Sequence, residues 1–450
     1  MSLAQEFLCS ALRFRFRSTR TAALAVSACG LVLSAHAATL CVNTAGSGGC
    51  YSTISAAVTA AASHDVINVA PGTYKEQVTI TKTLSLISTV KSGAVINAAG
   101  MGNGIFINGM AAAPNAGVYN VTVSGFFVWN ANFEGILVAN AVNVTLVDNT
   151  VMNNNKALNI STPACPGIPA FETNEGEDCG EGIHLMATHH SAVLRNTVAG
   201  NSGGILITDE TGPNNNNTIS DNFVHNNPFD CGITLASHGP ATSVIPSATL
   251  PYGVRYNTVS NNRSWNNGTQ VPGAGAGIGI FAPFPGTVNT GNVIISNDVR
   301  GNGMPGIAMH NHAWSAHAPA VNMNNNMIIG NYISNNAADT GDAATGGKTG
   351  INIFSVAPVN GTILLKNVFD DEAFDLVYSA PSGQLNTHLN SFDEGVGIAN
   401  LGTGTIDATL NWWDCQTGPA GGNCASVQGS GSITTPWLTA PYTAADADDY

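Results

Sequence analysis

Acidic and imidazole side chains recur at matching positions after short apolar runs in the middle of the sequence. Asp209 and Glu210 follow one run, His238 follows the next, and His312 follows a later one. Carboxyl groups beside imidazoles can exchange protons with a substrate, because neighbouring charges move their pKa values apart. These four are our candidate catalytic residues, with Glu210 as acid or base, Asp209 as its partner, and the histidines orienting groups or transferring protons.

A second set of side chains could bind a substrate, and His184 and His310 among them fall on the face near the candidate catalytic residues. Phe281 and Trp314 offer aromatic rings that could stack on sugars, and Arg195 is a basic residue of the kind that a lyase needs. A carboxyl pair about 5 Å apart would suit retaining glycoside cleavage, and a wider pair would suit inversion. The candidate substrate-binding residues are His184, His189, His310, Phe281, Trp314 and Arg195.

Two other interpretations of these residues stay open. A histidine or an aspartate at the end of a strand often caps a turn or bonds a neighbouring strand. His238, His310 and His312, with a carboxylate, would also suit zinc or copper. We assign no metal ligand from the sequence, and calcium or zinc is the divalent cation to consider as a cofactor.

The elements that position these residues belong to a repeating unit. Gly182, Gly204 and Gly232 each precede an isoleucine and open a short apolar run, which an Asn-rich turn and a second run follow. Such a unit is the mark of a stacked array. We expect residues one and three positions after each glycine to face the core, and those two and four positions after it to face solvent. Parallel strands about 4.8 Å apart would then place Glu210 beside His238.

The ends of the array have their own patterns. The stretch from Tyr51 to Ala62 fits an amphipathic helix, which could cover the open end of a strand stack. Asparagines at the turns tolerate left-handed backbone and can bond the asparagine one coil away. We expect a single domain over residues 38–450, with an N-terminal cap at about 39–65 and a C-terminal segment at about 411–441.

The first 37 residues are typical of a secretory signal peptide. Four arginines precede an apolar run that ends in Ala35-His36-Ala37. Cleavage after about Ala37 would make the protein secreted or periplasmic, although Val26–Cys29 also resembles a lipoprotein signal. No later run approaches the ~20 apolar residues that a membrane span requires, so we expect no transmembrane segment.

Charge and cysteine content narrow the function further. Charged residues make up 9% of the chain and the formal net charge is −14, which argues against a nucleic-acid partner. Export favours disulfides, and no Cys/His zinc spacing appears. The cysteines close in sequence are Cys41 with Cys50, Cys165 with Cys179 and Cys415 with Cys424, which leaves Cys231 as a buried thiol.

Several motifs resemble a known superfamily. The helix followed by VAPGTY, the GI-x-[IL] strands and the N-x-[VI] turns resemble a right-handed parallel β-helix of the pectin-lyase-like superfamily. The Asn-rich coils are similar to NosD-type carbohydrate-binding repeats, and residues 411–441 resemble a C-terminal segment of secreted bacterial members. The resemblance implies an all-β solenoid with an N-terminal capping helix. It implies no particular activity, because one fold hosts many functions.

The superfamily's hydrolase motif is matched only distantly. Polygalacturonase-like members carry an aspartate pair and a Gly-His-Gly turn, where this chain has Asp209-Glu210 and Ser237-His238-Gly239. We expect an exported, monomeric protein that cleaves a polysaccharide or an oligosaccharide as a hydrolase or a lyase. The alternatives are a non-catalytic glycan-binding or structural protein of the cell surface, and a NosD-like periplasmic accessory protein.

Overall fold

Short parallel strands joined by tight turns make up nearly all of the structure, a computed structural model. It describes residues 37–110, 117–161, 164–172, 179–238, 252–271, 273, 275–283, 286–311, 321–341, 343–393, 395–420 and 422–442. The signal peptide that we expect lies outside this part of the chain except for Ala37, and so do the candidate residues His312 and Trp314.

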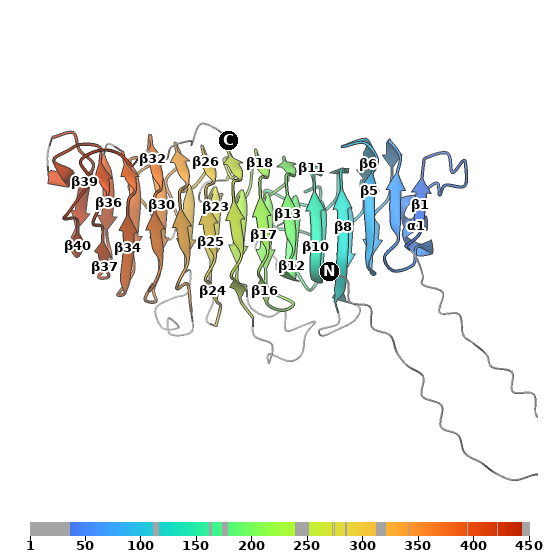
Figure 1. Cartoon of the computed structure of the whole chain (residues 1–450), viewed down its shortest axis with the longest axis horizontal. Helices are drawn as coiled ribbons and strands as arrows, with labels where there is room; N and C mark the ends of the chain where they lie inside the picture. The colour runs from blue at the N-terminus through green and yellow to red at the C-terminus, as the bar shows by residue number, and fades with distance from the viewer. Residues whose placement is uncertain are drawn as a thin grey trace, which may run out of the picture. The chain divides into compact units, whose positions relative to one another are not determined.

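Successive coils stack so that their strands form three parallel rows along the solenoid (Figure 1). The first row carries the Gly-Ile motifs and holds the candidate site. Its strands are β4 (Val78–Ile80), β7 (Ile105–Asn108), the start of β10 (Ile136–Val147), β12 (Ile183–His189), β15 (Ile205–Thr208), β19 (Ile233–Ala236), β23 (Ile278–Phe281), β27 (Ile307–His310), β30 (Thr349–Phe354), β33 (Phe374–Ser379), β36 (Val396–Asn400) and β39 (Ser426–Gly429).

The second row belongs to the same sheet as the first, and the third row forms a separate sheet. The second row contains β1 (Thr39–Val42), β2 (Val66–Val69), β5 (Leu84–Ser88), β8 (Val118–Ser124), the end of β10, β13 (Ala192–Leu194), β17 (Thr218–Ser220), β21 (Thr258–Ser260), β25 (Val293–Ile295), β28 (Met327–Ile329), β31 (Ile363–Leu365), β34 (Gln384–His388), β37 (Thr405–Asp407) and β40 (Ser432–Ile433). Three short strands join the two rows in the middle coils, namely β16 (Asn214–Asn215), β20 (Val254–Arg255) and β24 (Asn289–Thr290).

The third row consists of strands of two to four residues, and one short 3-10 helix follows it at Gly418–Ala420. These strands are β3 (Gly72–Tyr74), β6 (Ala94–Asn97), β9 (Phe127–Trp129), β11 (Thr150–Met152), β14 (Thr197–Ala199), β18 (Phe223–His225), β22 (Arg263–Trp265), β26 (Asp298–Arg300), β29 (Tyr332–Ser334), β32 (Val368–Asp370), β35 (Ser391–Phe392) and β38 (Trp412–Trp413).

The Gly-Ile motifs fill the core as the sequence predicts. The residue three positions after each glycine is fully buried in the core, as Leu185, Ile207 and Leu235 show. The glycine allows neighbouring coils to approach closely. A Cβ on Gly204 would lie 2.1 Å from the carbonyl oxygen of Gly232 on the next coil.

The prediction that the alternate residues of the first row face solvent is wrong. His184, Thr208 and His310 point away from the core and are nevertheless buried. Other segments cover this outer face. The predicted direction of these side chains is therefore correct, but the prediction that they are exposed to solvent is wrong. An apolar cluster, separate from the main core, buries part of this face. Its members are Phe106, Met110, Leu137, Ala139, Phe171 and Met186.

Buried asparagines tie each coil to the next, as the turn sequences predict. In the asparagine ladder each side-chain amide donates to the amide oxygen of the next member at 2.9–3.1 Å. The ladder consists of Asn149, Asn196, Asn222, Asn262, Asn297, Asn331, Asn367, Asn390 and Asn411. Each oxygen between Asn196 and Asn411 also accepts the backbone N–H of the preceding member.

The predicted capping helix is present as α1 (Ile54–Ala60), which packs against β1, β2 and β4 at the first coil (Figure 1). It begins later than predicted because Tyr51 forms a β-bridge with Val42. Thr53 then caps the helix by accepting the backbone N–H of Ala56 at 3.2 Å.

The three predicted disulfides are present, and Cys231 is a buried free thiol. Among the described helices, none is long and apolar enough to cross a lipid bilayer.

Candidate functional site

The carboxylates of Asp209 and Glu210 follow β15 and lie beside the residues that follow β19 on the next coil. Glu210 Oε1 is 3.0 Å from His238 Nδ1, which is the adjacency that the repeat predicts. Asp209 accepts two hydrogen bonds at 2.8 Å, from the backbone N–H of His238 and from the hydroxyl of Ser237. Asp209 therefore fixes the backbone at His238, while Glu210 holds its imidazole.

Glu210 is fully buried, yet its environment favours the ionised form. Burial by itself would raise the pKa of Glu210. The hydrogen bond and the charge of His238, with smaller contributions from His184 and Thr208, outweigh burial and lower this pKa to about 2. The carboxylate is therefore ionised at neutral pH and cannot serve there as a proton donor.

His184 belongs to the same neighbourhood, one coil before Glu210. It is the second residue of β12 and is 2% exposed. Its Nε2 is 2.8 Å from the hydroxyl of Thr208, and its Nδ1 is 3.6 Å from Glu134 Oε1. The imidazole thus lies between Glu134 and the end of β15.

Three more buried glutamates belong to this neighbourhood, and none of them was predicted from the sequence. They are Glu134, Glu172 and Glu181. We call them, with His184, Glu210 and His238, the glutamate–histidine cluster. Glu134 and Glu181 each stand directly before a Gly-Ile motif on consecutive coils, so an acidic residue at that position was a signal available in the sequence. Glu172 lies in an insertion, where no repeat position indicates its place.

The pKa values within the cluster are shifted in opposite directions. Burial is the largest cause that raises the pKa of Glu172, and the charges of Glu134 and Glu210 raise it further. Burial, with the charges of Glu134 and Asp230, also raises the pKa of Glu181. The pKa values of neighbouring carboxyl groups are therefore moved apart in this cluster, as in sites of acid–base chemistry.

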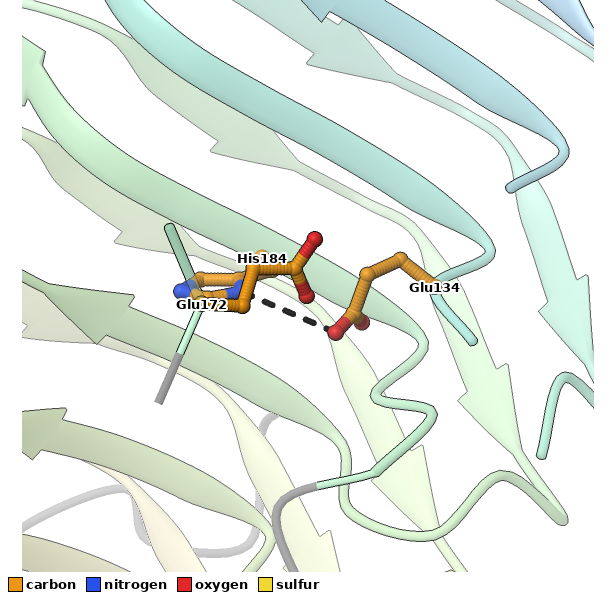
Figure 2. Close-up of side chains that lie close together, drawn as sticks. All are labelled: Glu134, Glu172 and His184. Carbon is orange, nitrogen blue, oxygen red and sulfur yellow. Dashed lines mark ion pairs between the residues drawn. The ribbon is translucent and has the colours of Figure 1, made fainter. Parts of the chain in front are cut away.

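Glu134, Glu172 and His184 are also the residues best placed to hold a metal ion. Figure 2 shows the Glu134 carboxylate directed at the His184 ring, with the Glu172 side chain beside them. One potential ligand atom from each residue lies within 4.8 Å of the others. Carboxylates and imidazoles are ligands of several divalent cations.

His310 and Phe281 lie further along the first row. The register places Phe281 one coil and His310 two coils beyond Ala236, which ends β19. His310 is fully buried, with Nδ1 3.7 Å from Asp339 Oδ2 and with the Phe281 ring 5.8 Å away between centroids. His310 therefore pairs with an acidic residue of its own.

His189 and Arg195 lie apart from these pairs. His189 ends β12 and lines a shallow hollow that also includes Tyr119 and Thr211, and burial lowers the pKa of its imidazole. Arg195 forms an ion pair with Asp148 at 3.1 Å on an exposed turn. The hollow borders the turn that carries Glu210, whereas Arg195 is engaged elsewhere.

Comparisons with known proteins give the fold and little beyond it. The family model described as "Right handed beta helix region" matches residues 96–247. No curated protein sequence matches the chain. Among solved structures, the Dettilon tailspike protein is 14% identical with a TM-score of 0.51, over 81% of this chain and 62% of that one.

Two further structures show weaker likeness. Geobacillus virus E2 ORF18 is 13% identical with a TM-score of 0.43, over 79% of this chain and 57% of that chain. The DFA-IIIase of Arthrobacter chlorophenolicus A6 without its lid is 12% identical with a TM-score of 0.43, over 82% and 89%. This chain thus spans less than two thirds of the tailspike and ORF18 chains.

The fold is a right-handed parallel β-helix, as the sequence motifs indicated. The likeness to NosD-type repeats stays a prediction, because the matching family model is the general β-helix region.

Proposed function

We propose that this chain is an exported carbohydrate-active protein that cleaves a polysaccharide or an oligosaccharide by acid–base chemistry where Glu210 meets His238. The observation that carries the proposal is the 3.0 Å contact between Glu210 Oε1 and His238 Nδ1 at the end of neighbouring strands. The three disulfides support export, because such bonds persist in oxidising compartments.

The geometry gives the two residues distinct roles. An ionised carboxylate at Nδ1 fixes the imidazole tautomer and stabilises the imidazolium, so that Nε2 exchanges the proton. His238 is then the group that transfers the proton, and Glu210 orients it. Asp209 holds the backbone of His238 in place. The pKa of about 2 fits Glu210 as a permanent anion rather than as the acid itself.

Most of the other candidate residues are proposed to act on the same glycan. His189 lines the hollow beside the Glu210 turn, and Phe281 lies one coil beyond the end of β19. We propose that these two, with His310 and Trp314, contact the glycan, and that His312 assists in catalysis. His184 and Arg195 lie against Glu134 and Asp148 instead. We also propose that the protein is a monomer.

A non-catalytic glycan-binding protein is the second candidate, and burial favours it. Asp209 and Glu210 are 0% exposed, and the side chain of His238 is 2% exposed. A substrate reaches such groups only if neighbouring groups move aside. The same contacts would otherwise serve to stabilise the ends of β15 and β19.

Incubating the protein with a panel of glycans distinguishes the glycan-cleaving enzyme from the non-catalytic glycan-binding protein. The exported protein should release reducing ends from a substrate of a hydrolase, or unsaturated sugars from a substrate of a lyase. His238→Gln should abolish the release, whereas Glu372→Gln, a buried glutamate of another coil, should preserve it. Glycan binding without turnover in the unmodified protein would select the second candidate.

A further inference from the structure

Glu134, Glu172 and His184 come from three separate segments and converge on the outer side of the first row (Figure 2). Glu134 lies in the turn before β10, His184 belongs to β12, and Glu172 lies in the insertion between β11 and β12. All three are buried, with exposed fractions of 1%, 8% and 2% for Glu134, Glu172 and His184.

Several polar atoms at this point have no hydrogen-bond partner among the described residues. With the carboxyl groups ionised, they are both carboxyl oxygens of Glu172, Oε2 of Glu134 and Nδ1 of His184. A protonated Glu172 would share its proton with Glu134. Native proteins leave few buried polar atoms unsatisfied, and each such atom requires an explanation. Four of them within one small volume indicate that a ligand belongs there.

The charges at this point require a cation or a shared proton. Two buried carboxylates that approach so closely repel one another when both are ionised. The lysine and arginine ion pairs of the described residues engage Asp148, Asp298 and Asp371 instead. A divalent cation would balance both carboxylates and satisfy the unpartnered atoms together.

The second nitrogen of His184 is held in the manner of a metal-binding histidine. Its Nε2 is 2.8 Å from the Thr208 hydroxyl. When Nε2–H donates to that hydroxyl, Nδ1 presents its lone pair to Glu134, from which it is 3.6 Å away. A partner on the opposite nitrogen commonly fixes the tautomer and the ring orientation of a histidine ligand.

We propose that Glu134, Glu172 and His184 bind a divalent transition-metal ion, with zinc as the best match. Zinc accepts imidazole and carboxylate ligands, and three protein ligands leave its fourth position open. Calcium instead prefers six to eight oxygen ligands. The ion ties the insertion that carries Glu172 to the coils of β10 and β12, beside the Cys165–Cys179 disulfide that closes the same insertion.

The inference goes beyond the proposed function and does not depend on it, because the three ligands are not the residues that transfer the proton. The experiment uses exported, tag-free protein that has been stripped with EDTA. Isothermal titration calorimetry with zinc chloride should give a stoichiometry of one zinc ion per chain. Zinc should also raise the melting temperature of the protein. Glu134→Gln and Glu172→Gln should each weaken zinc binding at least about tenfold, whereas Glu372→Gln should bind zinc as the unmodified protein does.

Cobalt(II) gives a readout that needs no variant. Bound by this trio, it should show the visible absorption of a four- or five-coordinate ion with nitrogen and oxygen ligands. Circular dichroism establishes that each variant is folded. The proposal is overturned if the unmodified protein takes up no zinc, if Glu172→Gln binds zinc equally well, if calcium binds there more tightly, or if cobalt keeps the spectrum of its hydrated ion.

Discussion

At the scale of single residues, Glu210 shows how one partner can reverse the effect of burial. Several buried carboxyl groups in the described structure have raised pKa values, including Glu172, Glu181 and Asp375, because burial disfavours their charge. Glu210 is equally buried, but His238 lowers its pKa to about 2. The pKa of the same residue type is therefore moved in opposite directions by its neighbours at positions one coil apart.

The lowered pKa of Glu210 predicts a pH-dependent contribution to stability. The pKa of the folded state lies below the ordinary value of 4.5, so the ionised form stabilises the fold above about pH 4.5. This contribution, about 3 kcal/mol at neutral pH, is lost as the pH falls from 4.5 to 2. Urea unfolding should show a large difference in unfolding free energy between the unmodified protein and Glu210→Gln at pH 7, and a smaller one at pH 3. An equal difference at both values would contradict the assignment.

Residue positions could be predicted from the sequence only where they share the repeat. Counting from each Gly-Ile motif places Glu210 beside His238, and the structure agrees. The same count could not reveal that His184 is buried, because alternation tells which way a side chain points and not what covers it. Glu172 sits in an insertion, so its approach to Glu134 depends on a loop path that no periodicity encodes.

At the scale of elements, the asparagine ladder accounts for the precise stacking of the coils. Each asparagine donates a side-chain N–H to the next member, and its amide oxygen accepts a backbone N–H of the preceding member. One residue type therefore provides partners for buried groups of both the side chain and the backbone. The turn sequences predicted this contact, since an asparagine at the same place in each coil meets its equivalent on the next. The start of α1 was predicted less well, because the bridge between Tyr51 and Val42 is a tertiary contact.

Removing one member should destabilise the ladder on both sides. Asn262→Ala leaves the backbone N–H of Asn222 and one of the two N–H groups of its side-chain amide without an acceptor. It also removes the donor to Asn297. We expect a loss of about 2–3 kcal/mol in unfolding free energy, measured by urea denaturation. The neighbouring exposed Asn261 has a φ of 55°, and Asn261→Gly keeps that conformation. A comparable loss in Asn261→Gly would show that the turn, and not the ladder, determines the effect.

At the scale of the whole molecule, stability depends on contacts between neighbouring coils, as in other stacked arrays. The fold could be inferred from the sequence because most coils repeat the same pattern, with an isoleucine in the core, a glycine at the close approach and an asparagine at the turn. Function could not be inferred in the same way. It depends on the few positions where the repeat is broken by an acid, a histidine or an insertion.

Export is the prediction that belongs to this scale. Protein recovered from the periplasm or the medium should begin at about Ala38, because the first 37 residues carry the signal-peptide pattern. Intact mass before and after reduction should show three disulfides and one free thiol, as the structure has them. An intracellular product that retains its N-terminus would contradict this prediction.

The central claim is that Glu210 and His238 together transfer a proton to or from a glycan. The most direct measurement is kcat/KM on the substrate that the panel identifies, for the unmodified protein, Glu210→Gln, His238→Gln, the double variant and the control Glu372→Gln. Each single variant should lose at least about a hundredfold in kcat/KM, the double variant should lose little more than either single variant, and the control should be unchanged. Full activity in Glu210→Gln, or losses that add independently in the double variant, would contradict the claim.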